Sequence, residues 1–255
     1  MTVPGVSRTR RWRRLVIAAV AALLLAISAP AYLSYRLVSH VERVDGAFAG
    51  LTDRPAEKAP QALDILLTSA DMVTLLHIDG DREGAALIWL PGGTDPDVGA
   101  VEGLTGIRID HVAHIDWAAF RELESSADPF WPPFTEDGLT NPRILGACQQ
   151  AYLKMLMDAS LHQEMRTHPR MLYHFLDTIS RHLTIDREWS DWDLARLVMS
   201  LRGMRSADIR YLTAPTGRRA SALWKAVAHD RLGSLDLLRS PGHGSRGIEG
   251  RACPT

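Results

Sequence analysis

Short apolar runs bounded by turn residues dominate the first half of the chain. The runs "LDILL" (63–67), "VTLLHID" (73–79) and "AALIWL" (85–90) have the length and apolar content of β-strands. The tripeptide "DGD" (79–81) separates the last two runs, and its residues favour a tight hairpin turn. We therefore predict three consecutive strands, with both aspartates of the tripeptide acting as turn formers.

A fourth strand is predicted over residues 107–116, where apolar and polar residues alternate with a period of two. His111 and His114 lie in this stretch, three positions apart, so on a strand their side chains point to opposite faces. Two imidazoles on opposite faces cannot bind the same ion. The pattern therefore argues against a shared metal site at these histidines.

Helical signals flank this strand. A short helix is expected near residues 97–105, ending at Gly106, and Asp116 is placed to cap a helix that begins at Trp117. The second half is mostly helical, with apolar periodicity near residues 143–160, 169–182 and 191–202, followed by a strand at 209–213 and a helix at 220–230. Ser190 and Asp193 resemble a capping box ahead of the third of these helices.

Strands that alternate with helices favour an α/β fold. We predict a single three-layer α/β/α sandwich with a mixed central sheet, over residues 62–232. Residues 34–61 are expected to form a linker, because their later part combines small residues with two prolines and shows no sustained period. Residues 233–255 are rich in Gly, Ser, Pro and Arg and are expected to be a disordered tail.

The N-terminus has the pattern of a membrane anchor. Residues 15–33 form an uncharged apolar run, and five arginines precede it in residues 1–14. The positive-inside rule then keeps the first residues in the cytoplasm and places the rest of the chain outside. A cleaved signal peptide is the alternative, since Ala29, Pro30 and Ala31 resemble a small-residue cleavage site. Both readings export the domain.

Composition, charge and the absence of common catalytic motifs argue against several classes of function. The formal net charge is −1, and the basic N-terminus makes the remainder of the chain more acidic still, which argues against a nucleic-acid surface. Export would permit a disulfide between Cys148 and Cys253, although Cys253 lies in the tail. The sequence contains no GxSxG, P-loop or HExxH motif. The segment "PGGTDP" (91–96) has the glycines of a phosphate-binding loop but no following basic residue, so a plain turn is favoured.

The stretch "VEGLTGIRIDHVAHIDWAAFREL" (101–123) resembles the helix–strand–helix of the LytR-CpsA-Psr family. Other segments resemble the family's strands and helices in the same order: "DILL", "ADMVTLLHID", "LIWLP", "CQQAYLKMLMD", "DWDLARLVMSLRGM", "IRYLTAP" and "LWKAVAHD". The resemblance covers about residues 62–230.

This resemblance implies an extracytoplasmic α/β domain that is anchored by one N-terminal helix and holds polyprenyl-pyrophosphate lipids. It implies transfer of a glycopolymer from that lipid to peptidoglycan, assisted by Mg²⁺. A pyrophosphate leaving group needs fixed cations, usually arginines and a carboxylate-bound metal, because negative charge develops on it. The implied partners are lipid-linked glycopolymer or peptidoglycan and the membrane.

Two motifs that carry charge in the family depart from the pattern here. The family's S-I-P-R-D appears as Trp89-Leu90-Pro91-Gly92-Gly93, so glycines replace the arginine and the aspartate. The family's D-x-x-R-x-x-R-Q-Q falls on residues 142–150, and only its two glutamines are kept.

The resemblance leaves four candidate site residues. Asp71 lies in the segment "ADMVTLLHID" and is the one acidic residue that the chain keeps from the family's motifs. It is the candidate catalytic and Mg²⁺-binding residue, with a turn or capping role as the alternative. Arg143, Gln149 and Gln150 are the candidate ligand-binding residues. Arg143 lies two positions from the family's arginine, which on a helix turns it by about 200°. Arg108, Arg166 and Arg170 are further arginines from which a relocated site could draw.

Loss of one preorganised charge contact typically costs about 10²- to 10³-fold in rate. The leading hypothesis is therefore a catalytically impaired member of the family that binds lipid-linked or wall glycopolymer, or pairs with an active relative. One alternative is an active phosphotransferase with relocated arginines. Another is a structural interaction module of the cell envelope.

Overall fold

A computed structural model describes residues 36–57, 59–69, 72–116, 118, 119, 122 and 168–234. The chain divides into two units, Met1–His40 and Val41–Thr255. In the first unit, residues 36–40 are helical, and the anchor predicted at 15–33 lies outside the described residues. None of the helices in the described segments is long and apolar enough to cross a membrane.

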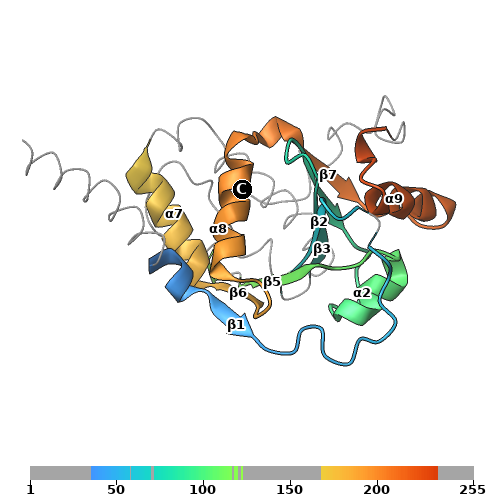
Figure 1. The fold of residues 1–255 in the computed structure, drawn as a ribbon, viewed down its shortest axis with the longest axis horizontal. Helices are drawn as coiled ribbons and strands as arrows, with labels where there is room; N and C mark the ends of the chain where they lie inside the picture. The colour runs from blue at the N-terminus through green and yellow to red at the C-terminus, as the bar shows by residue number, and fades with distance from the viewer. Residues whose placement is uncertain are drawn as a thin grey trace, which may run out of the picture. The chain divides into compact units, whose positions relative to one another are not determined.

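The second unit is built on a seven-stranded sheet with the order β1-β6-β5-β2-β3-β4-β7 (Figure 1). Three neighbouring pairs are parallel (β1 with β6, β2 with β5, β4 with β7), and the other three are antiparallel, so the sheet is mixed as predicted. The strands are β1 (Glu42–Val44), β2 (Leu63–Ser69), β3 (Met72–Ile78), β4 (Ala85–Trp89), β5 (His111–Ile115), β6 (Leu183–Asp186) and β7 (Ile209–Thr213).

The strand directions define two edges of the sheet. Strands β2, β4, β5 and β7 run the same way, so their C-terminal ends share one edge, which we call the carboxyl edge. The opposite edge, where these strands begin and β3 and β6 end, is called the amino edge.

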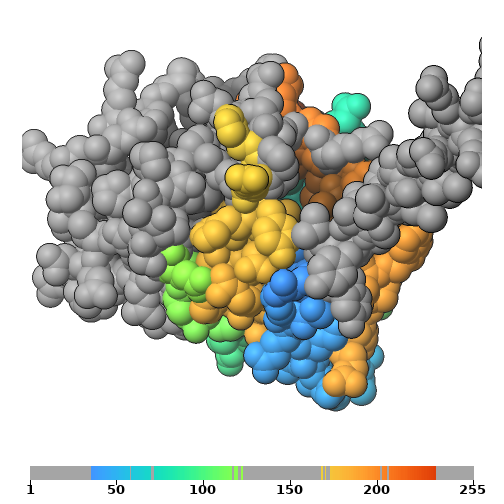
Figure 2. Space-filling model, turned by 90° about the vertical axis from the view of Figure 1, so that its left-hand side faces the viewer, coloured from blue at the N-terminus to red at the C-terminus, as the bar shows by residue number. Residues whose placement is uncertain are grey.

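Helices cover both faces of the sheet. Helices α7 (Pro169–Arg181) and α8 (Asp191–Ser200) pack on one face, and α2 (Val98–Thr105) and α9 (Arg218–Ala228) pack on the other (Figure 1). Short 3-10 turns occur at Leu201–Gly203, Ser206–Asp208 and Leu232–Ser234. Residues of α7 are in view at the surface in Figure 2. The α/β fold with a mixed sheet is thus confirmed.

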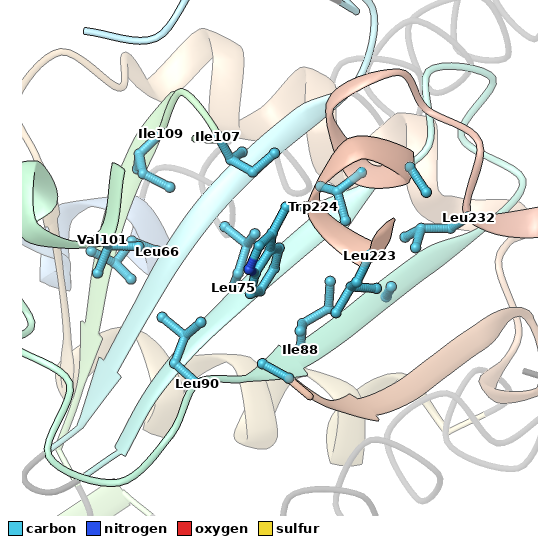
Figure 3. Packing of buried hydrophobic residues seen from close by; sticks show 14 of the residues in the cluster. Leu66, Leu75, Ile88, Leu90, Val101, Ile107, Ile109, Leu223, Trp224 and Leu232 are labelled. Carbon is cyan, nitrogen blue, oxygen red and sulfur yellow. The ribbon is translucent and has the colours of Figure 1, made fainter. Parts of the chain in front are cut away.

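Each face has its own hydrophobic core. On the face of α2 and α9, Leu66, Leu75 and Ile88 from the central strands contact the apolar side chains of the two helices, as Figure 3 shows. On the other face, Ile65, Leu87 and Trp89 belong to a cluster that the apolar sides of α7 and α8 complete. Strand β4 is buried at every position because both faces are covered.

Local signals set the helix ends as expected. The Asp97 carboxylate accepts a hydrogen bond from the Ala100 amide at the start of α2, and Gly106 ends that helix with φ of 67°, a conformation that glycine adopts without strain. Ser190 caps α8 by accepting from the Asp193 amide at 3.1 Å, which confirms the capping box position. Asp116 accepts from the Ala118 amide.

Two strands were not predicted. Glu42–Val44, inside the segment interpreted as a linker, forms the edge strand β1, and Leu183–Asp186 forms β6 directly after α7. The two strands pair in parallel, with Glu42 opposite Thr184. Strands of three and four residues are too short to show a period, and their pairing comes from partners far away in sequence.

The segment after β1 is also tied to the sheet. The Arg54 guanidinium donates to the Glu102 carboxylate at 2.7 Å, and Glu102 is only 4% exposed. Glu102 also accepts from the Ile109 amide at 2.9 Å, and Arg54 stacks over the Phe48 ring at 4.6 Å. A buried, bidentate arginine–carboxylate pair thus joins this predicted linker to α2 and to the residues that lead into β5.

A buried carboxylate joins β5 and β6 at the amino edge. Asp186 is 1% exposed and accepts hydrogen bonds from the Val112 and Trp189 amides, each at 2.9 Å, and from His111 Nδ1 at 3.1 Å. The His111 ring stacks on Trp189 with centroids 4.4 Å apart. His114 instead bonds to Thr68, so the two histidines have separate partners, as their spacing predicts.

Burial raises the pKa of Asp186, but the hydrogen bonds from His111 and the two amides outweigh burial, so its pKa lies below the ordinary value of 3.8. The ionised form is therefore favoured in the folded state. The ionised Asp186 carboxylate and its hydrogen bonds therefore stabilise the fold fully above pH 3.8, and this stabilisation is lost as the pH falls through the lower folded-state pKa of Asp186.

We predict that Asp186→Ala lowers the free energy of unfolding by about 3 kcal/mol at pH 7, because it leaves buried amides without an acceptor. Urea unfolding of both proteins should show this difference shrinking as the pH falls below 3.8. Asp191→Ala is the control, since Asp191 is exposed and its ion pair with Arg43 should contribute less than about 1 kcal/mol. A pH-independent difference would contradict the assigned role of the charge.

Candidate functional site

The carboxyl edge is the first candidate site, because open α/β sheets bind ligands at the carboxyl ends of their strands. There β4 ends at Trp89, which pairs with Thr74 of β3 and Thr213 of β7. The chain then forms an exposed turn in which the Thr94 amide and hydroxyl both donate to the Pro91 carbonyl, at 3.1 and 2.7 Å.

Gly92 and Gly93 lie at the tip of this turn and are exposed. A Cβ added at either glycine would meet no atom within 4 Å, and Gly93 has a φ of 83°. Space for longer side chains is therefore present at the two positions that correspond to the arginine and the aspartate of S-I-P-R-D. The turn lacks the charged side chains of S-I-P-R-D because glycines occupy these positions, and not because neighbouring atoms leave no space.

Three buried polar groups lie near this edge on the face of α7 and α8. The Ser69 hydroxyl, the Thr74 hydroxyl and the Trp89 indole N–H have no hydrogen-bond partner among the described residues. The Trp89 ring stacks on Tyr211 with centroids 6.0 Å apart. An unsatisfied buried polar group typically costs about 1–3 kcal/mol, so these three groups are the ones at this edge that call for a partner from beyond the described residues.

The predicted site residues Asp71, Arg143, Gln149 and Gln150 lie outside the described residues, as do Cys148 and Cys253. For Asp71, the flanking residues are informative. Ser69 pairs directly with Met72, so the connection in which Asp71 occurs leaves and re-enters the sheet at the carboxyl edge.

Arginines are distributed unevenly between the two edges. Arg218 and Arg219 begin α9 shortly after β7 ends at Thr213, and both are exposed. Arg108, one of the arginines considered for a relocated site, instead lies just before β5, at the amino edge. Arg170 is exposed at the start of α7, and Arg166 lies outside the described residues.

A second cluster of reactive side chains lies at the amino edge. His77 near the end of β3 is fully buried, and its Nδ1 donates to the Asp64 carboxylate at 2.8 Å. Its Nε2 lies 3.2 Å from Asp230 Oδ1 and 3.7 Å from Asp79 Oδ1. We call these four residues the His77 cluster.

Backbone contacts hold the His77 cluster in place. In the hairpin of β2 and β3, Asp64 and His77 are directly paired. The Gly80 amide donates to Asp230 Oδ2 at 3.0 Å, and Asp230 follows α9 with a positive φ of 53°. An Arg210 guanidinium nitrogen lies 3.7 Å from Asp79 Oδ2. Three segments of the chain thus converge on one imidazole.

Burial shifts the titration of the cluster. Burial raises the pKa of Asp64 above its ordinary value despite the opposing contact with His77, and it raises the pKa of Asp79 in the same way. Burial alone would lower the pKa of His77, but the neighbouring Asp64, Asp230 and Asp79 outweigh it and raise the pKa. The cluster therefore favours a positive charge at its centre.

The turn interpretation of "DGD" holds for one of its two aspartates. The Asp81 carboxylate accepts from the Glu83 amide at 2.9 Å, as a turn former should. The Asp79 backbone closes the turn by donating to the Gly84 carbonyl, but its side chain faces His77. His77 and Asp64 were not predicted as a pair, although each is the one titratable residue within its apolar strand.

Gly84 makes room for this arrangement, because a Cβ there would lie 2.4 Å from Asp79 Oδ2. We predict that Gly84→Ala lowers the free energy of unfolding by about 1–3 kcal/mol, by pushing Asp79 away from His77. In an Asp79→Ala background the same change should cost at least about 1 kcal/mol less, since the clash is gone. Chemical unfolding of the four proteins measures this coupling.

The control for this cycle is Gly103→Ala in α2, where an added Cβ meets nothing within 4 Å. That change should stabilise the protein slightly, by up to about 1 kcal/mol, because alanine favours helix. If Gly84→Ala is equally harmless, or if its cost is the same with and without Asp79, the close approach of Asp79 does not depend on this glycine.

No protein-family model and no curated protein matches this sequence. Among solved structures, a LytR-Csp2A-Psr enzyme from Actinomyces oris is 18% identical with a TM-score of 0.51, covering 74% of this chain and 96% of its own. B. subtilis TagV is 12% identical with a TM-score of 0.49, covering 69% and 98%. TagT bound to LIIa-WTA is 13% identical with a TM-score of 0.48, covering 75% and 99%.

The alignment with the Actinomyces oris enzyme spans nearly all of that protein and about three quarters of this chain. At this level of identity it concerns the fold and not the activity. The domain in this chain has the fold of the LytR-CpsA-Psr proteins.

Proposed function

We propose that this chain is a membrane-anchored extracytoplasmic protein of cell-envelope biogenesis that binds lipid-linked or wall glycopolymer, or an active relative, with little or no transferase activity. The observation that carries the proposal is the exposed Pro91-Gly92-Gly93 turn at the carboxyl edge of a LytR-CpsA-Psr fold. The fold supports the general role, and the two glycines support the loss of chemistry.

The physical argument concerns the leaving group. Transfer from a polyprenyl pyrophosphate requires fixed positive charge where the diphosphate departs. At the end of β4, neither Gly92 nor Gly93 carries a side chain that could supply or anchor such charge. Binding of the prenyl chain and glycan needs apolar surface and hydrogen bonds, which do not depend on these two positions.

The remaining assignments follow the resemblance. Asp71 is proposed as the residue that would hold Mg²⁺, and Arg143, Gln149 and Gln150 as ligand contacts. Residues 15–33 are proposed as the single membrane-spanning helix, with the five preceding arginines in the cytoplasm. This orientation would put the domain on the same side of the membrane as peptidoglycan.

One observation favours a second candidate, an active phosphotransferase with relocated cations. Arg218 and Arg219 are exposed at the start of α9, near the carboxyl edge, where helix N-termini also favour anions. These two guanidinium groups would have to replace the arginines of the family motifs.

A third candidate, a structural envelope module, would bind neither lipid nor glycan and would instead show a tight protein partner on crosslinking.

A titration of the full chain in detergent with geranylgeranyl pyrophosphate, with and without Mg²⁺, separates these candidates. We expect saturable binding without measurable phosphate release. Magnesium-dependent release that Asp71→Ala abolishes would refute catalytic impairment. Release that instead requires Arg218 and Arg219, tested by Arg218→Gln with Arg219→Gln, would establish the second candidate. Absence of any binding would favour the structural module.

We further predict that Gly92→Arg strengthens binding of geranylgeranyl pyrophosphate by about tenfold, because one charge-assisted hydrogen bond contributes about 1.5–3 kcal/mol. The control is Gly92→Gln, which adds a side chain without charge and should leave the affinity nearly unchanged. The measurement is the dissociation constant at fixed ionic strength. Equal affinities for all three proteins would mean that the diphosphate does not lie beside the 91–94 turn.

A further inference from the structure

The His77 cluster at the amino edge leaves an electrostatic problem at its centre. His77 Nδ1 donates its hydrogen to Asp64, so in the neutral imidazole Nε2 carries a lone pair. That lone pair faces Asp230 Oδ1 at 3.2 Å and Asp79 Oδ1 at 3.7 Å, and both of these oxygens are acceptors too. A positively charged species is required between three such atoms.

The charge balance favours a dication over a proton. The cluster contains three carboxylates, those of Asp64, Asp79 and Asp230, and the Arg210 guanidinium lies 3.7 Å from Asp79. With neutral His77 they leave an excess of two negative charges. A proton on His77 cancels one of these charges, whereas a divalent cation cancels both.

The distances fit a metal ion. Zinc bonds to nitrogen and oxygen at about 2.0–2.2 Å, which places two ligand atoms of a tetrahedral site about 3.3 Å apart. The distances from His77 Nε2 to the two carboxylate oxygens, 3.2 and 3.7 Å, bracket that value. All three ligand atoms lie within 4.8 Å of one another.

Each prospective ligand is also held by a second contact. Asp64 orients the imidazole from its other nitrogen, as carboxylates do for many metal-binding histidines. The Gly80 amide holds the second oxygen of Asp230, and Arg210 approaches the second oxygen of Asp79. The three coordinating atoms are therefore presented to one point before any ion arrives.

We propose that His77 Nε2, Asp79 Oδ1 and Asp230 Oδ1 bind one divalent cation of the Zn²⁺ or Mn²⁺ class. An imidazole with two carboxylates suits these ions better than Mg²⁺ or Ca²⁺, which prefer ligand sets made of oxygen alone. Asp79 and Asp230 are 20% and 28% exposed, so the ion reaches the site from solvent, and water completes its coordination.

The ion would join Asp230, two residues beyond the end of α9, to the hairpin of β3 and β4. Binding to the folded state alone stabilises a protein in proportion to the logarithm of the ion concentration over its dissociation constant. The site lies at the opposite edge of the sheet from the 91–94 turn, so it is separate from the Mg²⁺ proposed for Asp71. It does not depend on the proposed function.

The test uses the full chain in detergent, treated with EDTA and dialysed, at one neutral pH. Calorimetric titration with ZnCl₂ should show one more bound equivalent of Zn²⁺ in the wild type than in Asp230→Asn. Zn²⁺ should also raise the midpoint temperature of unfolding of the wild type but not that of Asp230→Asn. Asp230→Asn keeps the shape of the side chain and should weaken this site by at least about 100-fold. MgCl₂ at the same concentration should give a smaller shift.

Asp81→Asn is the matched control, because Asp81 lies in the same hairpin but caps the turn at Glu83 and does not face His77. It should bind Zn²⁺ as the wild type does. Identical stoichiometry and thermal shift for the wild type and Asp230→Asn would overturn the proposal and leave His77 as a protonated ion-pair residue. Asp230→Asn should bind geranylgeranyl pyrophosphate normally, so failure of this site and failure of the proposed function are distinguishable.

Discussion

The pairing of β2 with β3 determines what lies at both edges of the sheet. Seven residue pairs run from Leu63 opposite Ile78 to Ser69 opposite Met72, so the register is set along the whole hairpin. A slip of one residue would turn His77 to the other face, away from Asp64, and would move the apolar side chains of the slipped strand from one core to the other, where they do not fit. The same register places Ser69 opposite Met72 at the carboxyl edge.

The two edges consequently differ in charge and chemistry. The carboxyl edge, where the fold would be expected to handle a diphosphate, has an exposed Pro91-Gly92-Gly93 turn and buried polar groups without partners among the described residues. The amino edge has a dense set of carboxylates around His77, which is fully buried. Among the described residues, the 91–94 turn thus has no charged side chain, whereas charged groups are concentrated around His77.

The sequence predicted the parts of this structure that depend on local patterns. The apolar runs of β2, β3 and β4, the alternation around β5, the Gly106 stop and the Ser190 cap were readable because neighbouring residues determine them, although β5 (His111–Ile115) is shorter than the strand predicted over 107–116. Strands β1 and β6 were missed because each is short and is stabilised by pairing with strands far away in sequence: β1 pairs with β6, and β6 pairs with β1 and β5. The His77 cluster was missed because Asp230 is 153 positions from His77, and only the packing of α9 on the sheet brings them together.

The central claim is that this LytR-CpsA-Psr fold holds a polyprenyl diphosphate without the clamp of cations that transfer requires. The most direct test is a crystal structure of the full chain with a prenyl diphosphate. The account predicts the diphosphate at the carboxyl edge, beside Gly92, with at most one guanidinium in hydrogen-bonding distance. A diphosphate bound by several guanidinium groups and a magnesium ion would contradict it.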